Sequence, residues 1–150
     1  MTAEKFNDYA RFVATTTSDL SKNTMALTQR ISTLEGTTST TQFSSGEIVR
    51  SAEINMATLM TSVIGMLAES GEFAEVVKKK IFKADTQFTE DERFHMKREL
   101  GDVLWYWVQG CTALGFTPHE VMEENIIKLE KRYPNGFEVV RSEVRADGDI

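Results

Sequence analysis

The chain has 150 residues, 41% hydrophobic and 27% charged, a composition typical of one ordinary globular domain with a proper core. Its formal net charge of −6, without a basic stripe, argues against a nucleic-acid partner, because such binding depends on clustered Lys and Arg. The single cysteine, Cys111, excludes an intramolecular disulfide and indicates a cytoplasmic protein, and no stretch has the apolar length of a signal peptide or a membrane span.

The N-terminal third predicts two helices and a loop. The helices are expected over residues 3–17 and 19–34, with the second ending at Gly36. Residues 36–46 form a polar run rich in Ser and Thr, which predicts a surface loop or a crossover between helices.

The middle of the chain predicts three more helices. A long one is expected from residue 47 to 82, and the next from 90 to 114, stopping at a glycine. The T-P-H-E sequence at 117–120 predicts a helix start, with Thr as the N-cap, Pro at the first position and Glu at the third. This helix is expected to end near Arg132, because Y-P-N-G is a turn signal.

The C-terminal segment F-E-V-V-R-S-E-V-R alternates weakly and predicts a short strand or an extended arm, followed by a frayed D-G-D-I end. No other strand pattern is visible, so the predicted class is all-α, an antiparallel helical bundle of about five helices. The expected organisation is one domain over 1–150, with N-terminal helices (3–35), a polar loop (36–46), a catalytic helical core (47–132) and a short tail (133–150).

Glu69 stands inside the apolar face of its predicted helix. At about 100° per residue, the apolar residues that share its sector are Leu59, Met66, Phe73, Val76 and Val77. Glu72 lies at the edge of the sector, one turn further along. A carboxylate in such a position is costly unless a basic residue, a proton or a metal ion neutralises it. Taken alone, a structural salt bridge or contact with water is the simpler explanation of Glu69.

The following helix repeats the arrangement. Glu99 and Asp102 share one side, beside an apolar face made of Leu100, Val103, Leu104, Trp107, Cys111 and Leu114. Packed helices lie about 8–10 Å apart, so the two acidic pairs can converge. Carboxylates without a Cys/His cluster suit Mg²⁺ or Mn²⁺ and disfavour zinc. With both pairs considered, a metal site becomes the preferred interpretation.

Basic and amide side chains provide candidate phosphate ligands. Asn125 falls within the inner sector of the last long helix, and Lys128 and Arg132 lie along its edge. Each alone is more often solvated, but together they could bind a polyphosphate. The Lys78–Lys80 run adds three cations, among which spacing alone selects none.

Three blocks in series carry a family resemblance. The first two are G-M-L-A-E-S-G-E-F-A-E-V-V-K-K, with Glu69 and Glu72, and K-R-E-L-G-D-V-L-W-Y-W, with Glu99 and Asp102. The third is E-N-I-I-K-L-E-K-R-Y-P-N-G-F. In order and spacing, over about residues 59–137, they resemble the MazG-like branch of the all-α nucleotide pyrophosphohydrolase superfamily, which includes dimeric dUTPases and dCTP pyrophosphatases.

The resemblance implies a homodimer or homotetramer that converts a (d)NTP to (d)NMP and pyrophosphate, with Mg²⁺ (or Mn²⁺ as a substitute) and a metal-activated water. The implied metal-binding and catalytic residues are Glu69, Glu72, Glu99 and Asp102. The implied phosphate- or sugar-binding residues are Lys79, Asn125, Lys128 and Arg132. Trp105 or Tyr106 is a candidate for stacking on the base, with core or interface packing as the alternative.

Three other functions stay open at this point. The first is a narrow-substrate enzyme of the same superfamily, acting on dUTP or dCTP. The second is a non-catalytic helical module whose acidic face binds a partner or Ca²⁺. The third is a scaffold that binds metal and nucleotide without turnover. The position of Glu69 argues against the second, because a partner-binding acidic face should lie opposite the apolar stripe.

Overall fold

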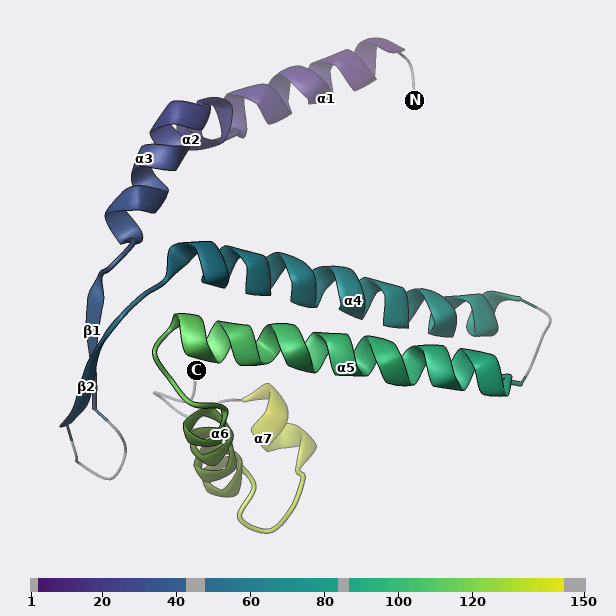
Figure 1. The fold of residues 1–150 in the computed structure, drawn as a ribbon. Helices are drawn as coiled ribbons and strands as arrows, with labels where there is room; N and C mark the ends of the chain where they lie inside the picture. The colour runs from purple at the N-terminus through teal and green to yellow at the C-terminus, as the bar shows by residue number, and fades with distance from the viewer. Residues whose placement is uncertain (1–2, 43–47, 84–86, 145–150) are drawn as a thin grey trace.

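The computed structural model describes residues 3–42, 48–83 and 87–144. Two long helices, α4 (Met56–Phe82) and α5 (Glu90–Ala113), lie antiparallel and form the most extensive contact between elements (Figure 1). Next comes α6 (Pro118–Arg132), which contacts α5 and is followed by the short α7 (Val139–Glu143). This helical core confirms the predicted all-α, antiparallel architecture.

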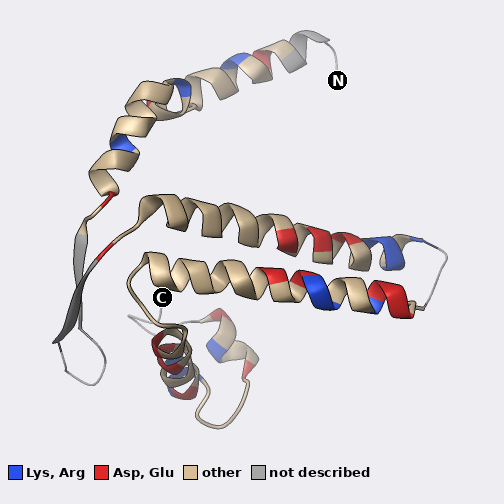
Figure 2. Cartoon of the chain, viewed as in Figure 1, with Lys and Arg blue, Asp and Glu red and all other residues tan. Residues whose placement is uncertain are grey.

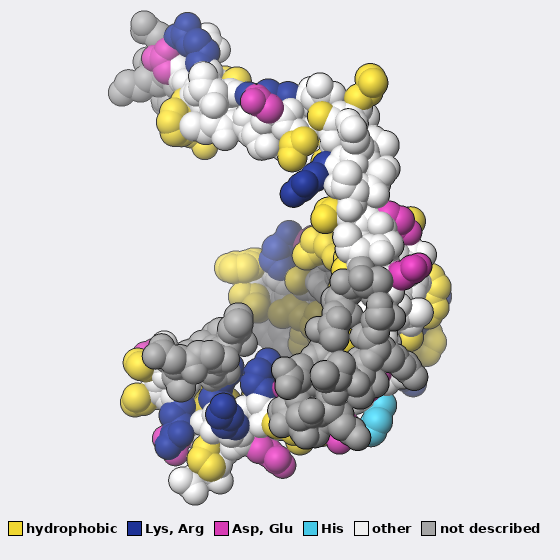
Figure 3. Space-filling view, turned by 90° about the vertical axis from the view of Figure 1, so that its left-hand side faces the viewer, with side chains coloured by type: hydrophobic (Ala, Val, Ile, Leu, Met, Phe, Trp, Pro, Cys, Tyr) yellow, Lys and Arg dark blue, Asp and Glu magenta, His cyan; other side chains and the backbone are white. Residues whose placement is uncertain are grey.

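The N-terminal third consists of α1 (Ala3–Thr16), α2 (Asp19–Lys22) and α3 (Thr24–Leu34). The predicted helix over 19–34 is therefore interrupted, because Asn23 ends α2 and caps α3 by accepting a hydrogen bond from the Ala26 N–H at 3.1 Å. Figures 1 and 3 show this N-terminal part extending away from the α4–α5 pair, with α3 contacting α4, to which the chain returns through a β-hairpin.

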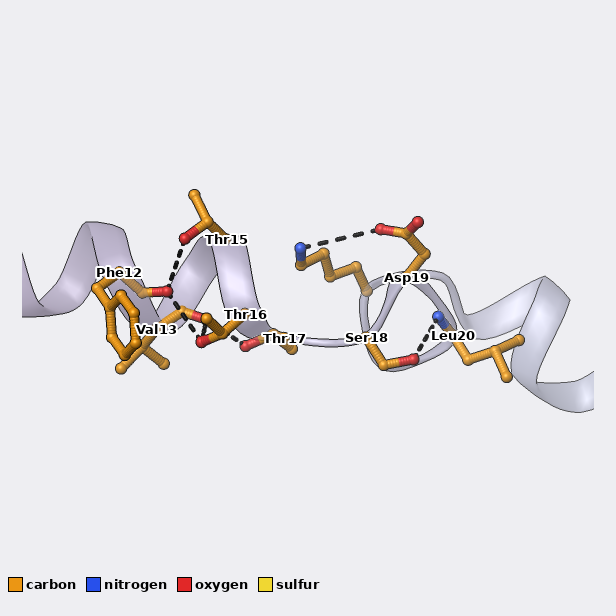
Figure 4. Close-up of polar contacts among 9 residues, drawn as sticks. Phe12, Val13, Thr15, Thr16, Thr17, Ser18, Asp19 and Leu20 are labelled. Carbon is orange, nitrogen blue, oxygen red and sulfur yellow. Dashed lines mark hydrogen bonds and ion pairs between the residues drawn. The ribbon is translucent and has the colours of Figure 1, made fainter.

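Side-chain hydroxyls mark the junction of α1 and α2 (Figure 4). The Thr15 and Thr16 hydroxyls donate to the Phe12 carbonyl oxygen at 2.8 and 2.9 Å. The Ser18 hydroxyl accepts a hydrogen bond from the Leu20 N–H at 3.3 Å. The Ser18 bond satisfies an N–H of the first turn of α2, which has no partner within the helix. The threonine hydroxyls bond back to a carbonyl one turn earlier, as Thr side chains in helices commonly do.

The predicted start of the long helix at residue 47 is wrong. β1 (Thr38–Gln42) pairs antiparallel with β2 (Ile48–Glu53), so part of the predicted polar loop 36–46 is also a strand, and residues 43–47 lie outside the described residues. Ile48 and Val49 are β-branched and favour a strand. The helix begins only after Asn55, whose side chain accepts a hydrogen bond from the Thr58 N–H at 2.8 Å.

The start of α4 is held by its neighbours. The Glu35 carboxylate accepts a hydrogen bond from the Met56 N–H at 2.6 Å, and the Asn55 N–H donates to the Ala113 carbonyl oxygen at 2.9 Å. These bonds join the end of α3, the start of α4 and the end of α5. Because three elements meet here, the relative position of α4 and α5 is fixed at this end of the pair.

The later helix boundaries agree with prediction, except in the tail. Thr117 and Glu120 form the expected capping box of α6, and Gly115, at φ +79°, follows α5. The predicted strand or arm after Phe137 is wrong, because Val139–Glu143 is helical and satisfies its backbone bonds locally, as in the Ser142 N–H to Glu138 carbonyl bond of 3.1 Å. The predicted frayed end lies outside the described residues.

Much of the apolar surface of the single chain is uncovered. Cys111 is buried, as predicted, and burial raises the pKa of its thiol. Ala113, which was not among the predicted core residues, is buried as well. Leu100 and Leu104, predicted to belong to the same core face, are 55% and 57% exposed. Within the described part of the chain, no helix combines the length and apolar character needed to cross a membrane.

Candidate metal centre

Small residues bring α4 and α5 close together. The Ser62 hydroxyl donates to the Tyr106 carbonyl oxygen at 2.8 Å. A Cβ at Gly65 would lie 2.3 Å from the Tyr106 ring, and one at Gly110 would lie 2.6 Å from Ser62 Oγ. Glycine at these two positions therefore allows the helices to approach, and this approach places the acidic segments of α4 and α5 side by side (Figure 2).

The four predicted carboxylates fall into two groups that share a member. Glu69 from α4 and Glu99 and Asp102 from α5 each offer an oxygen, and these atoms lie within 4.8 Å of one another. Glu72 forms a second group with His95 and Glu99, again with ligand atoms within 4.8 Å. The structure thus brings together all four residues that sequence spacing singled out.

The charge of this cluster is poorly balanced. Glu99 is only 6% exposed, yet in the described residues neither it nor Glu69, Glu72 or Asp102 forms an ion pair with Lys or Arg. The pKa of Glu69 is raised, first by desolvation, then by a hydrogen bond with Glu99 and by the negative charges of Glu72, Glu99 and Asp102. A cation would remove this repulsion, so the cluster suits a bound metal ion.

The lysines that follow the first acidic pair have different surroundings. Lys78 and Lys79 both pair with Glu75, the latter at 3.6 Å, and both remain exposed. Lys80 is only 10% exposed and lies 2.8 Å from the Glu92 carboxylate at the start of α5. Lys80 therefore links the end of α4 to the start of α5, whereas the substrate-binding role of Lys79 stays a prediction.

The candidate phosphate ligands on α6 differ in exposure. Asn125 and Lys128 are exposed. Arg132 is half-buried, with its guanidinium carbon 5.8 Å from the Tyr133 ring centroid. Their predicted contact with phosphate or sugar stays a prediction.

A pocket of about 560 Å³ adjoins the carboxylates. Its walls come mainly from apolar or small residues of α4, with Met60, Ile64 and Ala68 among them, and Glu69 and Tyr106 also line it. Tyr106 is thus the better placed of the two stacking candidates, since Trp105 is exposed and touches its ring edge-on, with centroids 4.8 Å apart. The small residues at 57, 61, 65 and 68, spaced by three or four, were the sequence signal for this pocket.

His95 is the site residue that sequence reasoning missed. Its Nδ1 lies 3.1 Å from Glu99 Oε1, one helical turn away. The spacing H-x-x-x-E places both side chains on one face of α5, and this spacing could have indicated His95 from the sequence.

Comparison with known proteins places these residues in a family context. The MazG nucleotide pyrophosphohydrolase domain model matches residues 57–137, which include the four carboxylates and α6. The Gene 37 protein of Mycobacterium phage L5 is 36% identical over 73 residues, which cover 49% of this chain and 64% of the phage protein. The aligned stretch therefore spans less than two thirds of that relative. No solved structure matches the chain.

Proposed function

Because this chain belongs to the MazG nucleotide pyrophosphohydrolase family, we propose that it hydrolyses a (d)NTP to (d)NMP and pyrophosphate with Mg²⁺. The observation that carries the proposal is the meeting of Glu69, Glu99 and Asp102, with ligand oxygens within 4.8 Å and without a Lys or Arg partner in the described residues. Such a cluster is suited to holding a cation beside a polyphosphate.

The donor set fits a magnesium ion. Mg²⁺ prefers oxygen ligands, and Glu69, Glu99 and Asp102 supply carboxylate oxygens from two facing helices. When bound, the ion would neutralise phosphate charge and lower the pKa of bound water. The protein itself contributes the fixed geometry, because α4 and α5 are held together through Ser62 and the glycines at 65 and 110.

The neighbouring pocket supports a nucleoside subsite. Its volume of about 560 Å³ lies within the range of roughly 300–1,000 Å³ found for small-molecule sites. Apolar walls and the Tyr106 ring suit a base, and Glu69, which lines the pocket, also belongs to the group of candidate cation ligands. Phosphate and sugar contacts are assigned to Lys79, Asn125, Lys128 and Arg132.

A homo-oligomer is part of the proposal. Exposed apolar side chains occur on both long helices, at Val63, Ile64 and Leu67 of α4 and at Leu100 and Leu104 of α5. Burial of one such side chain contributes about 1.5–3 kcal/mol, so covering this surface with further copies would be strongly favourable. A dimer or tetramer would also allow α6 side chains from a neighbouring copy to approach the carboxylates.

The test is a nucleotide hydrolysis assay. The purified protein is incubated with each NTP and dNTP, including dUTP, in Mg²⁺ and in EDTA, and products are separated by anion-exchange chromatography. Mg²⁺-dependent release of monophosphate and pyrophosphate is the expected result, and the rate ranking decides whether the enzyme is broad or restricted to dUTP or dCTP. Release of diphosphate and free phosphate, or no turnover by the folded protein, would contradict the proposal.

A further inference from the structure

We infer that Glu72, His95 and Glu99 form a second cation site, which takes a transition-metal ion such as Co²⁺, Mn²⁺ or Zn²⁺ in preference to Mg²⁺. The inference deepens the proposed function, on which it rests for the neighbouring Mg²⁺ site. It starts from the cluster that, in the described part of the chain, adds a nitrogen donor to the carboxylates, with all three ligand atoms within 4.8 Å of one another.

The geometry is close to that of a bound ion. Ligand atoms about 2.0–2.2 Å from one ion lie no more than about 4.4 Å apart, so a separation of up to 4.8 Å requires only a small side-chain adjustment. His95 and Glu99 are one turn apart on α5 and already 3.1 Å from each other, and Glu72 approaches from α4. Two helices therefore hold the donors in place without a loop.

The donor types separate this site from its neighbour. Glu69, Glu99 and Asp102 offer oxygen only, which suits Mg²⁺, whereas an imidazole nitrogen suits zinc and other transition ions. His95 is 49% exposed, so the ring faces solvent and an ion can reach it from outside. The same helix pair thus offers one oxygen-only site and one mixed nitrogen–oxygen site.

Glu99 links the two sites. It belongs to both groups, and its carboxylate has two oxygens. It is also the most buried of the site residues, at 6% exposure, and the described residues give it no Lys or Arg partner. A buried carboxylate is stable only when its charge is compensated, and cations on both sides would compensate that charge. The shared position of Glu99 is therefore the main structural argument for two ions.

The experiment is a titration with Co²⁺ of three proteins: the wild type, His95→Gln and Glu72→Gln. Calorimetry measures the affinity, and the visible absorption of bound Co²⁺ reports on its ligands. Loss of even an outer-sphere partner weakens metal binding about 10–100-fold, so loss of either ligand should weaken one Co²⁺ site at least about tenfold. His119→Gln, which changes the other histidine of the chain, is the matched control and should bind as the wild type does. Mg²⁺ binding should be unchanged in His95→Gln.

The outcomes separate the site from the enzyme activity. Unaltered Co²⁺ affinity and absorption in His95→Gln would overturn the second site, even if pyrophosphate release is normal. An equal loss of Mg²⁺ and Co²⁺ binding in that variant would overturn the metal preference. A selective loss of Co²⁺ in His95→Gln would support the site, even if the wild type releases no pyrophosphate and the proposed function fails.

Discussion

Ser62 of α4 and Gly110 of α5 adjoin so closely that a Cβ at position 110 would lie 2.6 Å from Ser62 Oγ. The same hydroxyl, fully buried, donates to the Tyr106 carbonyl oxygen at 2.8 Å. This contact fixes both the separation and the register of the two helices. Since Glu69 and Glu99 lie further along the same helices, it also governs how closely the carboxylates meet.

Gly110→Ala should destabilise the protein by about 1–3 kcal/mol, as expected of overpacking at a buried contact. Ser62→Ala should cost about 0.5–1.5 kcal/mol through the lost hydrogen bond. The double variant should lose less stability than the sum of the two single losses. Removal of Oγ leaves only the Ser62 Cβ near the new methyl group, at 3.7 Å. Urea unfolding of the three variants measures this coupling, and additive effects would contradict it.

Gly65→Ala should destabilise the helix pair more than Gly110→Ala does. A Cβ there would lie 2.3 Å from the Tyr106 ring, and a ring held between two helices moves less easily than a hydroxyl. Gly71→Ala on the same helix is the control, since no atom lies within 4 Å of its Cβ, and it should be neutral or stabilise by up to about 1 kcal/mol. Thermal unfolding compares them, and equal midpoints would refute this explanation of Gly65.

Sequence periodicity predicted the parts of the fold that depend on local spacing. The i, i+3 carboxylate pairs and the Thr117 cap lie where the pattern placed them, because both follow from helical geometry within a few residues. The β-hairpin was missed, because pairing of Thr38 with Glu53 is a nonlocal choice and the first strand contains no apolar residue. The proposed role of His95 depends on the approach of Glu72 from another helix, which spacing along one helix does not reveal.

The Lys80–Glu92 pair should hold the end of α4 against the start of α5. Glu92 accepts from the Thr89 N–H at 2.8 Å and lies 2.8 Å from Lys80 Nζ, so one carboxylate serves both the cap of α5 and the end of α4. Glu92→Gln should lower the unfolding midpoint at pH 7. Glu90→Gln, which removes an exposed contact with Arg93, should have little effect. Equal shifts in the two variants would argue against a special role for Glu92.

The stabilisation that the Lys80–Glu92 pair provides should decrease at low pH. The hydrogen bond from Lys80, followed by the backbone N–H of Thr89, lowers the pKa of Glu92 below 4.5. Because the folded-state pKa is depressed, the stabilisation is complete above pH 4.5 and is lost as the pH falls through the lowered value. Acid titration of wild type and Glu92→Gln should therefore converge at low pH, and a constant difference down to pH 2 would contradict the assignment.

In metal-free protein, the contribution of Glu69 to stability should change with pH in the opposite direction to that of Glu92. The pKa of Glu69 is raised by desolvation, by the hydrogen bond with Glu99 and by the nearby carboxylates, so the folded state holds a proton above pH 4.5. Stability should then decline as the pH rises from 4.5 through the raised pKa, because the unfolded chain releases that proton first. Glu69→Gln should flatten this decline in EDTA. A slope unchanged by the substitution would assign it to another group.

Turnover should depend on Glu69 and Asp102 together with their cation. Replacing either by Ala should reduce pyrophosphate release by at least about 100-fold, the usual loss when charge stabilisation of a transition state is removed. Helicity by circular dichroism should stay close to wild type, because neither side chain makes an ion pair with Lys or Arg in the described residues. Glu90→Ala is the matched control, since Glu90 pairs with Arg93 at the surface and belongs to neither cluster. Wild-type rates in both Glu69→Ala and Asp102→Ala would exclude this cluster as the catalytic centre. A loss of rate in these two variants but not in the control would show that turnover depends on the cluster itself and not on the overall negative charge of the helix surface.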